Sequence, residues 1–170
     1  MIRTYKYRLY PTKAQTRQLT FLLDQARYLY NQALEQRITN SREKGKGISY
    51  PQQWAYFRDL RRANPDTLGQ LNATSLQQLL RRLDKAFGAF FRRLKAGEKA
   101  GFPRCKATHR FHSLEYRYGD GCKLRQDDRM VLYVQNAGEI KVKYHRVLPK
   151  NAVIKHVVVK RSNRKWYVCL

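Results

Sequence analysis

The sequence predicts an α+β fold, in which a helical bundle is inserted into a small β-barrel or curled sheet. Apolar residues recur at helical spacing between residues 11 and 112, whereas short alternating runs, typical of strands, occupy residues 1–10 and 113–170. A chain of 170 residues can bury one core and a second small one. We therefore expect residues 1–10 to form the first strand, residues 11–112 a helical domain, and residues 113–170 the remainder of the barrel.

The first elements are a strand and a long helix. Residues 2–9 alternate, and one side of the predicted strand carries Arg3, Tyr5, Tyr7 and Leu9. Pro11 ends the strand. Thr12 and Gln15 have the spacing of a capping box, so the helix begins there, and its apolar stripe continues to about residue 37.

A short helix and a third, strongly amphipathic helix follow. The spacing of Trp54, Phe57 and Leu60 predicts the short one. Ser75 and Gln78 have capping-box spacing, so the third helix is expected to begin at Ser75. Its apolar stripe predicts one continuous buried face: Leu76, Leu79, Leu80, Leu83, Phe87, Phe90, Phe91 and Leu94. We expect its phenylalanines, and Phe102 after it, to lie in the core rather than to stack on bases.

After Pro103 the helical periodicity ends and short alternating runs begin. They lie at residues 113–118, 123–124, 130–134, 139–144, 153–160 and 165–170. Ser162 and Asn163 separate the last two runs, as in a hairpin. We expect these strands to form a curled sheet with the N-terminal strand. Small barrels of this oligonucleotide-binding type present a basic groove to single strands.

The charge of the chain favours nucleic acid as its partner. Thirty-six Lys and Arg against twelve Asp and Glu give a net charge of +24, and such self-repulsion favours a polyanionic partner. Between Arg81 and Arg110 there are ten Lys or Arg and two acids. A membrane is disfavoured because the sequence has no run of eighteen apolar residues and no signal peptide. Arginine planes and twelve tyrosines suit phosphate binding and base stacking.

The cysteines predict neither disulfides nor a metal site. Cys105, Cys122 and Cys169 are odd in number and form no C-x-x-C pair, so we expect reduced thiols in a cytoplasmic protein. Cys105 and Cys122 with His109 and His112 match no usual zinc-finger spacing, and unliganded surface histidines are the better interpretation.

No catalytic residues are predicted in this chain. The acids are few and scattered, and the adjacent Asp127 and Asp128 fit a hairpin tip better than a metal-binding pair. The sequence also lacks a P-loop, a dinucleotide fingerprint and a nucleophile motif.

Five segments in order resemble the N-terminal part of TnpB (OrfB) proteins. These segments are YKYRLYPTKAQ, ARYLYNQAL, LDKAFGAFFRRLKAGEKAGFPRCK, IKVKYHRVLP and RKWYVCL, and they span nearly the whole chain. TnpB proteins are RNA-guided DNA endonucleases encoded by bacterial and archaeal insertion sequences, where they often carry the label transposase, and they are related to type V CRISPR effectors.

This resemblance implies a wedge-like barrel with a helical recognition domain, and guide RNA and double-stranded target DNA as partners. The family's nuclease domain follows the last strand, so the catalytic acids, the divalent metal and the zinc are expected only in that missing C-terminal part. We expect a cytoplasmic, nucleoid-associated bacterial or archaeal protein with no cofactor in these 170 residues. Whether Leu170 is the natural end stays open, as does a homodimer.

The resemblance also implies where the target-adjacent DNA motif is bound. By position, the candidates are Tyr50, Ala73, Thr74, Gln77, Arg117 and Tyr118. A glutamine can bond adenine through both polar atoms, and a tyrosine can stack or contact a thymine methyl group. The motif itself stays open because the Ala73 side chain cannot form hydrogen bonds.

Phosphate contacts to RNA or DNA are expected from two basic surfaces. The first comprises Arg81, Arg82, Lys85, Arg92, Arg93, Lys95, Lys99, Arg104 and Lys106. The second, on the barrel, comprises Arg3, Lys6, Arg8, Lys141, Lys143, His145 and Arg146. Two other functions stay open: a stand-alone, non-catalytic DNA- or RNA-binding repressor or RNA chaperone, and a ribosome-associated basic protein. An in-frame V-D-x-G after the Leu170 codon would favour the nuclease.

Overall fold

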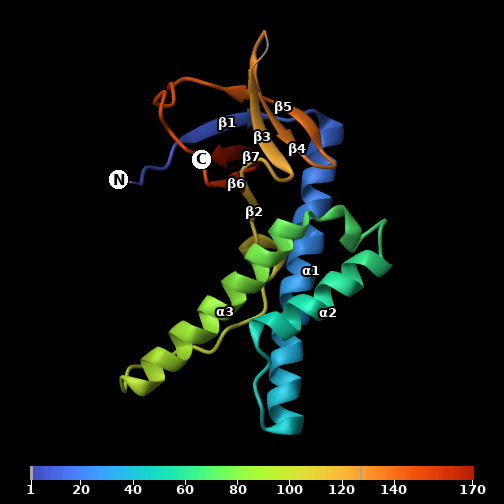
Figure 1. The fold of residues 1–170 in the computed structure, drawn as a ribbon, viewed down its shortest axis with the longest axis vertical. Helices are drawn as coiled ribbons and strands as arrows, with labels where there is room; N and C mark the ends of the chain where they lie inside the picture. The colour runs from blue at the N-terminus through green and yellow to red at the C-terminus, as the bar shows by residue number, and fades with distance from the viewer. Residues whose placement is uncertain (1, 127) are drawn as a thin grey trace. The chain divides into compact units, whose positions relative to one another are not determined.

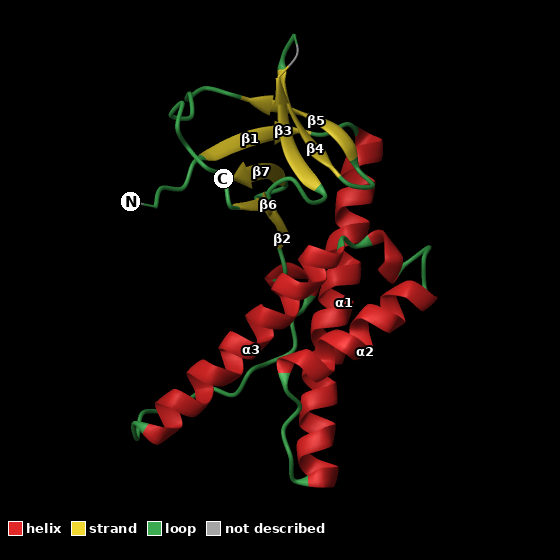
Figure 2. Ribbon diagram, viewed as in Figure 1, coloured by secondary structure: helices red, strands yellow, loops and turns green. Residues whose placement is uncertain are grey.

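The computed structural model describes residues 2–126 and 128–170, which form three α-helices and seven strands (Figures 1 and 2). The α+β fold class is therefore confirmed. In chain order the elements are β1 (Lys6–Tyr10), α1 (Lys13–Lys44), α2 (Tyr50–Ala63), α3 (Ala73–Lys95), β2 (Ser113–Arg117), β3 (Cys122–Gln126), β4 (Met130–Val134), β5 (Gly138–Lys143), β6 (His156–Ser162) and β7 (Lys165–Cys169).

All seven strands belong to one antiparallel sheet, with the order β2-β6-β7-β1-β5-β4-β3. The N-terminal strand β1 lies in its middle, between β7 and β5, so its predicted membership of the sheet is confirmed. Residues far apart in the sequence thereby become neighbours, because Arg8 of β1 lies opposite both Tyr167 of β7 and Lys143 of β5.

The sheet is not closed into a barrel, which corrects the expectation from the sequence. Among the described residues the edge strands β2 and β3 form no ladder with each other, and one isolated bridge joins Tyr118, just after β2, to Cys122. Gly119 and Gly121 between them have φ angles of 86° and 76°, which glycine adopts without strain. The three helices lie in the N-terminal part of the chain, after β1 and before β2, and are not set into a closed barrel.

The chain divides into two compact units, which are described separately below. The sheet unit consists of the residues up to Asp24 together with His112–Leu170, and the helical unit consists of Gln25–Phe111. Helix α1 begins in the sheet unit and continues into the helical unit. The assignment of domains at residues 1–10, 11–112 and 113–170 stays a prediction.

The core of the sheet unit lies on one face of the sheet. Leu9 and Trp166 are directly opposite each other and are both buried. Tyr7, on the same side of β1, is 1% exposed, and its ring stacks on that of Tyr144 with 5.1 Å between the ring centroids. Its hydroxyl donates to the backbone carbonyl of Arg146 at 2.8 Å. Burial raises the pKa of Tyr7, so this hydroxyl remains a donor.

One predicted helix cap and one predicted hairpin in the sheet unit are confirmed. The N–H of Gln15 donates to Oγ1 of Thr12, and the N–H of Thr12 donates to Oε1 of Gln15, which is the capping box at the start of α1. Strands β6 and β7 form a hairpin whose turn residues Asn163 and Arg164 have φ angles of 49° and 60°, the left-handed pair that a two-residue hairpin favours. Asp128 lies between β3 and β4, and Asp127 lies outside the described residues.

A buried arginine joins the three helices of the helical unit. Arg37 of α1 is 8% exposed; its Nε donates to Oε1 of Gln53 on α2 at 2.7 Å, and its Nη2 donates to Oδ1 of Asp84 on α3 at 2.8 Å. Its guanidinium carbon also lies 5.1 Å from the centroid of the Phe87 ring. Gln53 in turn donates to the backbone carbonyl of Ala33 at 2.8 Å. Polar contacts thus fix the helices in addition to the leucine packing.

Helix α3 begins at Ala73, and its N-cap is Asn72, which corrects the predicted start at Ser75. Oδ1 of Asn72 accepts from the N–H groups of Thr74, at 2.8 Å, and Ser75, at 3.4 Å. Asn is among the strongest N-cap residues, and here it satisfies the donors that the helix leaves unpaired. Ser75 is buried in the first turn, and among the described residues its hydroxyl has no hydrogen-bond partner.

The apolar stripe of α3 is buried only as far as Phe87, although the sequence predicted burial to Leu94. Phe91 is 59% exposed, Leu94 is 51% exposed, and Phe102 is 46% exposed, so the expectation of a core position is wrong for these three. The reason is that the last turns of α3 diverge from α1 and α2 (Figure 1). These exposed residues do not mark a membrane span, because no described helix is long and apolar enough for one.

Candidate nucleic-acid interface

One exposed basic surface follows α3 and the segment after it, and we call it the helix surface. Its members are Arg81, Lys85, Arg92, Arg93, Lys95, Lys99 and Arg104. Two predicted members differ, since Arg82 and Lys106 are half-buried. The Arg82 guanidinium carbon lies 5.7 Å from the centroid of the Phe111 ring, so Arg82 packs on an aromatic core residue of the helical unit.

The segment after α3 is tied down at both ends. Gly97, with a φ of 71°, allows the helix to end in a Schellman motif, in which the N–H of Glu98 donates to the carbonyl of Arg93 at 2.9 Å. At the other end, the Asn31 side chain accepts from the N–H of Lys106 at 2.8 Å and donates to its carbonyl at 3.1 Å. The basic loop between these two points is therefore held in the helical unit.

A second surface lies on the outer face of the sheet, and we call it the sheet surface. Its lysines Lys6, Lys141 and Lys143 are exposed, whereas Arg8, Lys160 and Tyr167 are half-exposed. Residues directly opposite each other in antiparallel strands share a face, and the register gives one row across four strands: Lys160, Tyr167, Arg8 and Lys143. Lys6 shares the face by strand alternation, and Tyr10 lies opposite Lys141 on it. Four predicted phosphate-binding residues, Lys6, Arg8, Lys141 and Lys143, are thus brought together.

Tyrosine rings hold the cations at the centre of the sheet surface. Nζ of Lys6 lies 4.2 Å from the centroid of the Tyr167 ring. The Arg8 guanidinium carbon lies 5.3 Å from the ring centroids of both Tyr167 and Tyr10. Tyr10 is 47% exposed. Such an alternation of cations and exposed rings suits a phosphate backbone with accessible bases.

Sequence reasoning missed Tyr10, Lys160 and Tyr167 as members of the sheet surface. The signal was present, because Tyr10 has the same parity in β1 as Lys6 and Arg8. The cross-strand positions of Lys160 and Tyr167 depend on the register between strands, which the sequence does not give.

Other predicted barrel residues lie off this row. Arg3 precedes β1 and is exposed. Arg146 and His145 follow β5, and the guanidinium carbon of Arg146 lies 4.7 Å from the Tyr5 ring centroid. The His145 ring lies edge-on to Tyr7, with 5.5 Å between centroids. These positions form the rim of the sheet unit's aromatic core rather than part of the row.

Four of the six predicted motif-binding residues lie in the first two turns of α2 and α3 in the helical unit: Tyr50, Ala73, Thr74 and Gln77. The Arg81 guanidinium carbon is 5.7 Å from the ring centroid of Tyr50, the first residue of α2. Gln77 is half-exposed in α3. The Thr74 hydroxyl already donates to Asn72 within the helix cap. Tyr50 and Arg81 are therefore together, whereas Thr74 has a structural role of its own.

The other two predicted motif-binding residues belong to the sheet unit. Arg117 is exposed at the end of β2, opposite His156. Tyr118 is half-exposed, and its N–H donates to the carbonyl of Lys155 at 3.2 Å. Both lie at the edge of the sheet, beside basic residues of β6 and the segment before it.

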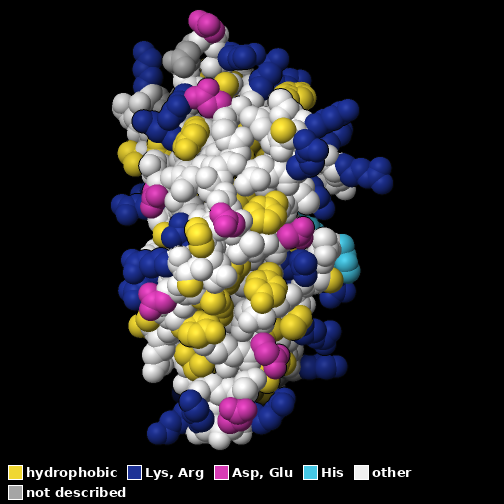
Figure 3. Space-filling view, turned by 90° about the vertical axis from the view of Figure 1, so that its right-hand side faces the viewer, with side chains coloured by type: hydrophobic (Ala, Val, Ile, Leu, Met, Phe, Trp, Pro, Cys, Tyr) yellow, Lys and Arg dark blue, Asp and Glu magenta, His cyan; other side chains and the backbone are white. Residues whose placement is uncertain are grey.

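Several acids form ion pairs with arginines, so their negative charge is offset locally. Asp84 pairs with Arg37, and Nη1 of Arg125 lies 2.8 Å from Oε1 of Glu139. Arg58 lowers the pKa of Asp59, mainly through a hydrogen bond at 2.9 Å. In the face drawn in Figure 3, Asp and Glu side chains lie singly, several of them beside Lys or Arg side chains.

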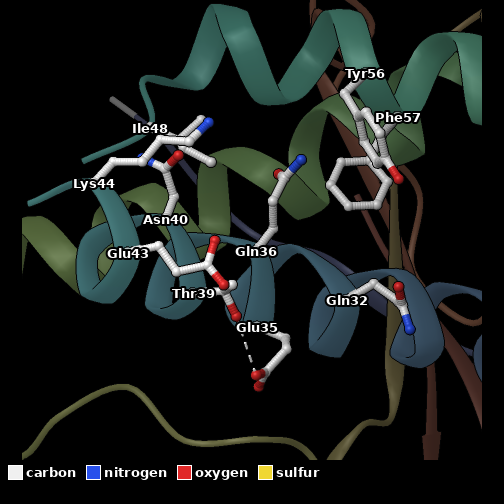
Figure 4. A pocket seen from close by; sticks show the side chains of 10 residues that line it. All are labelled: Gln32, Glu35, Gln36, Thr39, Asn40, Glu43, Lys44, Ile48, Tyr56 and Phe57. Atoms are coloured by element: carbon white, nitrogen blue, oxygen red, sulfur yellow. Dashed lines mark hydrogen bonds between the residues drawn. The ribbon is translucent and has the colours of Figure 1, made fainter. Parts of the chain in front are cut away.

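A hollow of about 450 Å³ in the helical unit has a different character (Figure 4). It lies between the second half of α1 and α2, and its lining is Gln32, Glu35, Gln36, Thr39, Asn40, Glu43, Lys44, Ile48, Tyr56 and Phe57. The Thr39 hydroxyl donates to Oε1 of Glu35 at 3.4 Å. Two glutamates and several amides around one lysine do not favour phosphate, so this hollow is not part of the interface.

The three thiols are free, and they differ in exposure. Cys105 is exposed in the basic loop, whereas Cys122 is buried in β3. Burial raises the pKa of Cys122 to about 12, so it stays a protonated, unreactive thiol at neutral pH. Among the described residues, no group of three or more His, Cys, Asp or Glu side chains is placed to hold a metal ion.

In comparisons with known proteins, one family model matches part of this chain, and two longer proteins are similar to nearly all of it. A family described as a helix-turn-helix domain, HTH_OrfB_IS605, matches residues 1–46. In the described part of that range the chain forms strand β1 and the single helix α1, so the description does not fit the local structure.

Both relatives are similar over nearly the whole chain. A protein of Streptomyces pristinaespiralis named "Putative RNA-guided DNA endonuclease" is 28% identical over 170 residues, which is 99% of this chain and 40% of the relative. "Putative RNA-guided DNA endonuclease InsQ" of Escherichia coli (strain K12) is 26% identical over the same shares. The chain spans about 40% of the length of these relatives. The resemblance to the N-terminal part of TnpB-type RNA-guided DNA endonucleases is thereby confirmed.

Proposed function

We propose that this chain is the nucleic-acid-binding part of an RNA-guided DNA endonuclease and that it holds guide RNA and the duplex beside the target. The observation that carries the proposal is the row of cations and tyrosines across the sheet surface. Strand register places Lys160, Tyr167, Arg8 and Lys143 side by side although they are distant in the sequence. The packing of the core does not require such a row, whereas the binding of a phosphate backbone with accessible bases does.

The helix surface supports the same function in a second way. Its seven Lys and Arg lie on α3 and on the tied loop after it, and only Glu98 and Asp84 bring negative charge to that stretch. Asp84 is already paired with Arg37. Phosphate contacts of this kind position a nucleic acid without reading its sequence.

Recognition of the target-adjacent motif is assigned to the start of α2 and α3. Tyr50 and Arg81 lie within cation–π distance, and half-exposed Gln77 is one helical turn before Arg81. An amide side chain can bond adenine at two positions, and Arg81 can bond a phosphate or a guanine. Arg117 and Tyr118, at the edge of the sheet, are proposed as motif-binding residues of the sheet unit in their own right.

The proposal is tested by measuring binding of labelled RNA and duplex DNA against salt concentration. We expect a steep fall of affinity with salt, because each phosphate contact releases a counterion. Replacing Arg8, Lys143 and Lys160 by Ala, or Arg92, Arg93 and Lys95 by Ala, is expected to reduce the logarithmic salt slope by about three. Arg62→Ala is the control, since Arg62 is exposed on α2 and lies 3.9 Å from Asp59.

Sequencing the nucleic acid that remains bound after purification in high salt identifies the partner. A discrete structured RNA supports the guide-binding role. A preparation that binds neither RNA nor duplex would contradict the proposal. Binding of one DNA sequence with no RNA present would instead indicate a stand-alone repressor.

A further inference from the structure

Four phenylalanine rings form a closed cluster near the C-terminal end of α3. Phe87 contacts Phe91 and Phe102, with 6.3 Å and 5.6 Å between ring centroids. Phe90 contacts the same two rings, both at 5.2 Å. Each ring therefore touches two others, and the cluster joins the helix to the loop that returns from it. We call these four residues the phenylalanine cluster.

One side of the phenylalanine cluster is buried and the other is open. Phe87 is 8% exposed and has the Arg37 guanidinium over its ring. Phe91 and Phe102 are 59% and 46% exposed, and Leu94 beside them is 51% exposed. Exposing two phenylalanines and a leucine together costs free energy, because each would be more stable out of water.

Exposed cations lie close in sequence to this open apolar edge. Between Gly88 and Phe111 the chain carries the exposed Arg92, Arg93, Lys95, Lys99 and Arg104, and Glu98 is the sole acid of that stretch. The patch therefore fits an occupant that combines negative charge with flat apolar faces. Unpaired nucleobases on a phosphate backbone have both properties, whereas in a duplex the base faces are stacked on each other.

We propose that Phe91 and Phe102 form a stacking site for unpaired bases and that the cations near them in sequence bind the adjoining phosphates. This inference rests on the proposed function, because it names the kind of nucleic acid that the end of α3 binds. The buried half of the cluster and the Schellman turn at Gly97 hold the two rings in place, so stacking requires little further ordering.

The chain offers a matched control for exposure alone. Tyr56 is 54% exposed, but it lines the hollow, where the two carboxylates of Glu35 and Glu43 outnumber the one lysine, Lys44. An effect of exposed aromatic area in general would appear at Tyr56 as well as at Phe91. An effect of stacking beside phosphates would appear only at the phenylalanine cluster.

The test compares Phe91→Leu, Phe102→Leu and Tyr56→Leu in the full chain. Leucine keeps an apolar side chain but removes the ring face. The probes are an RNA hairpin with a long unpaired loop and a blunt RNA duplex with the same number of phosphates. We expect each phenylalanine variant to bind the hairpin about tenfold more weakly and the duplex within twofold of the unchanged chain. Tyr56→Leu should change neither, and the salt slope should be equal in all four proteins.

Several results would overturn this inference while leaving the proposed function intact. Unchanged hairpin binding in both phenylalanine variants is one, and equal weakening for hairpin and duplex is another. A third is a dimer of the unchanged chain, seen by sedimentation, that Phe91→Leu dissociates without affecting hairpin binding. If the unchanged chain bound neither probe, the proposed function itself would fail. A hairpin and a bubble duplex made of DNA then identify which nucleic acid supplies the unpaired bases.

Discussion

The sheet surface and the helix surface are both basic, but their cations are held in different ways. On the sheet surface, backbone register sets the spacing of the cations, and tyrosine rings contact Lys6 and Arg8 directly. On the helix surface, Arg92, Arg93 and Lys95 lie on turns of α3 with no buried residue. The last buried residue of α3 before them is Phe87, whose ring carries the Arg37 guanidinium.

This difference bears on what each surface can recognise. Side chains stacked on rings and fixed by a ladder are restricted in their rotamers, so they suit a ligand of defined shape. Long side chains on an exposed helix adapt to many phosphate positions. We therefore expect the sheet surface to be sensitive to the identity of its cations and the helix surface to respond mainly to their number.

Arg37→Ala is expected to have the largest effect and to act on the helical unit. It removes the Arg37 donor from Oε1 of the fully buried Gln53 and removes the bond to Asp84. We expect a loss of about 2 to 3 kcal/mol in the free energy of unfolding, less than for a fully buried ion pair because Asp84 is half-exposed. Urea unfolding measures it.

The comparison between the two surfaces supplies the control for this variant. At temperatures where the Arg37→Ala variant remains folded, its binding through the sheet surface should be unchanged. Adding Arg8→Ala tests this, because the resulting loss of affinity should be the same in the Arg37→Ala variant as in the unchanged chain. A loss of stability below 0.5 kcal/mol would show that the network around Arg37 does not hold the helices together.

Asn72→Ala is expected to have an intermediate effect, and Ser75→Ala a negligible one. Asn72 caps α3, and replacing an N-cap asparagine by alanine costs about 1 kcal/mol. The buried hydroxyl of Ser75 has no partner among the described residues, so its removal should change stability by less than about 0.5 kcal/mol or increase it. Thermal unfolding of both variants tests this. The reverse order would restore Ser75 as the cap that its spacing with Gln78 predicted.

Local patterns predicted the elements well. The alternating run at residues 130–134 coincides with β4, and the capping box of Thr12 and Gln15 starts α1 as predicted. These features depend on a few neighbouring residues. The wrong cap at Ser75 shows the limit, because Asn72 lies only three residues earlier and is also a strong capping residue.

Features that depend on distant partners were not predictable in the same way. Periodicity marks strands but not which edges pair, so barrel closure was predicted where, among the described residues, one isolated bridge joins the segment after β2 to β3. The stripe of α3 shows an apolar face, but not that the neighbouring helices diverge before Phe91. Tyr167 was not predicted as a member of the sheet surface, because its position beside Arg8 depends on the register of β1 and β7.

Replacing arginine by lysine gives the smallest expected effect and separates the two surfaces most directly. Arg8→Lys keeps the charge but loses the planar group near the rings of Tyr10 and Tyr167. We expect affinity for single-stranded RNA to fall about threefold, in line with an exposed cation–π contact. Arg92→Lys, on a turn of α3 with no buried residue, should leave the affinity unchanged within error. The salt slope should stay the same in both variants, because neither changes the number of charges. If Arg92→Lys weakened binding as much as Arg8→Lys, the rings would not be what distinguishes the sheet surface.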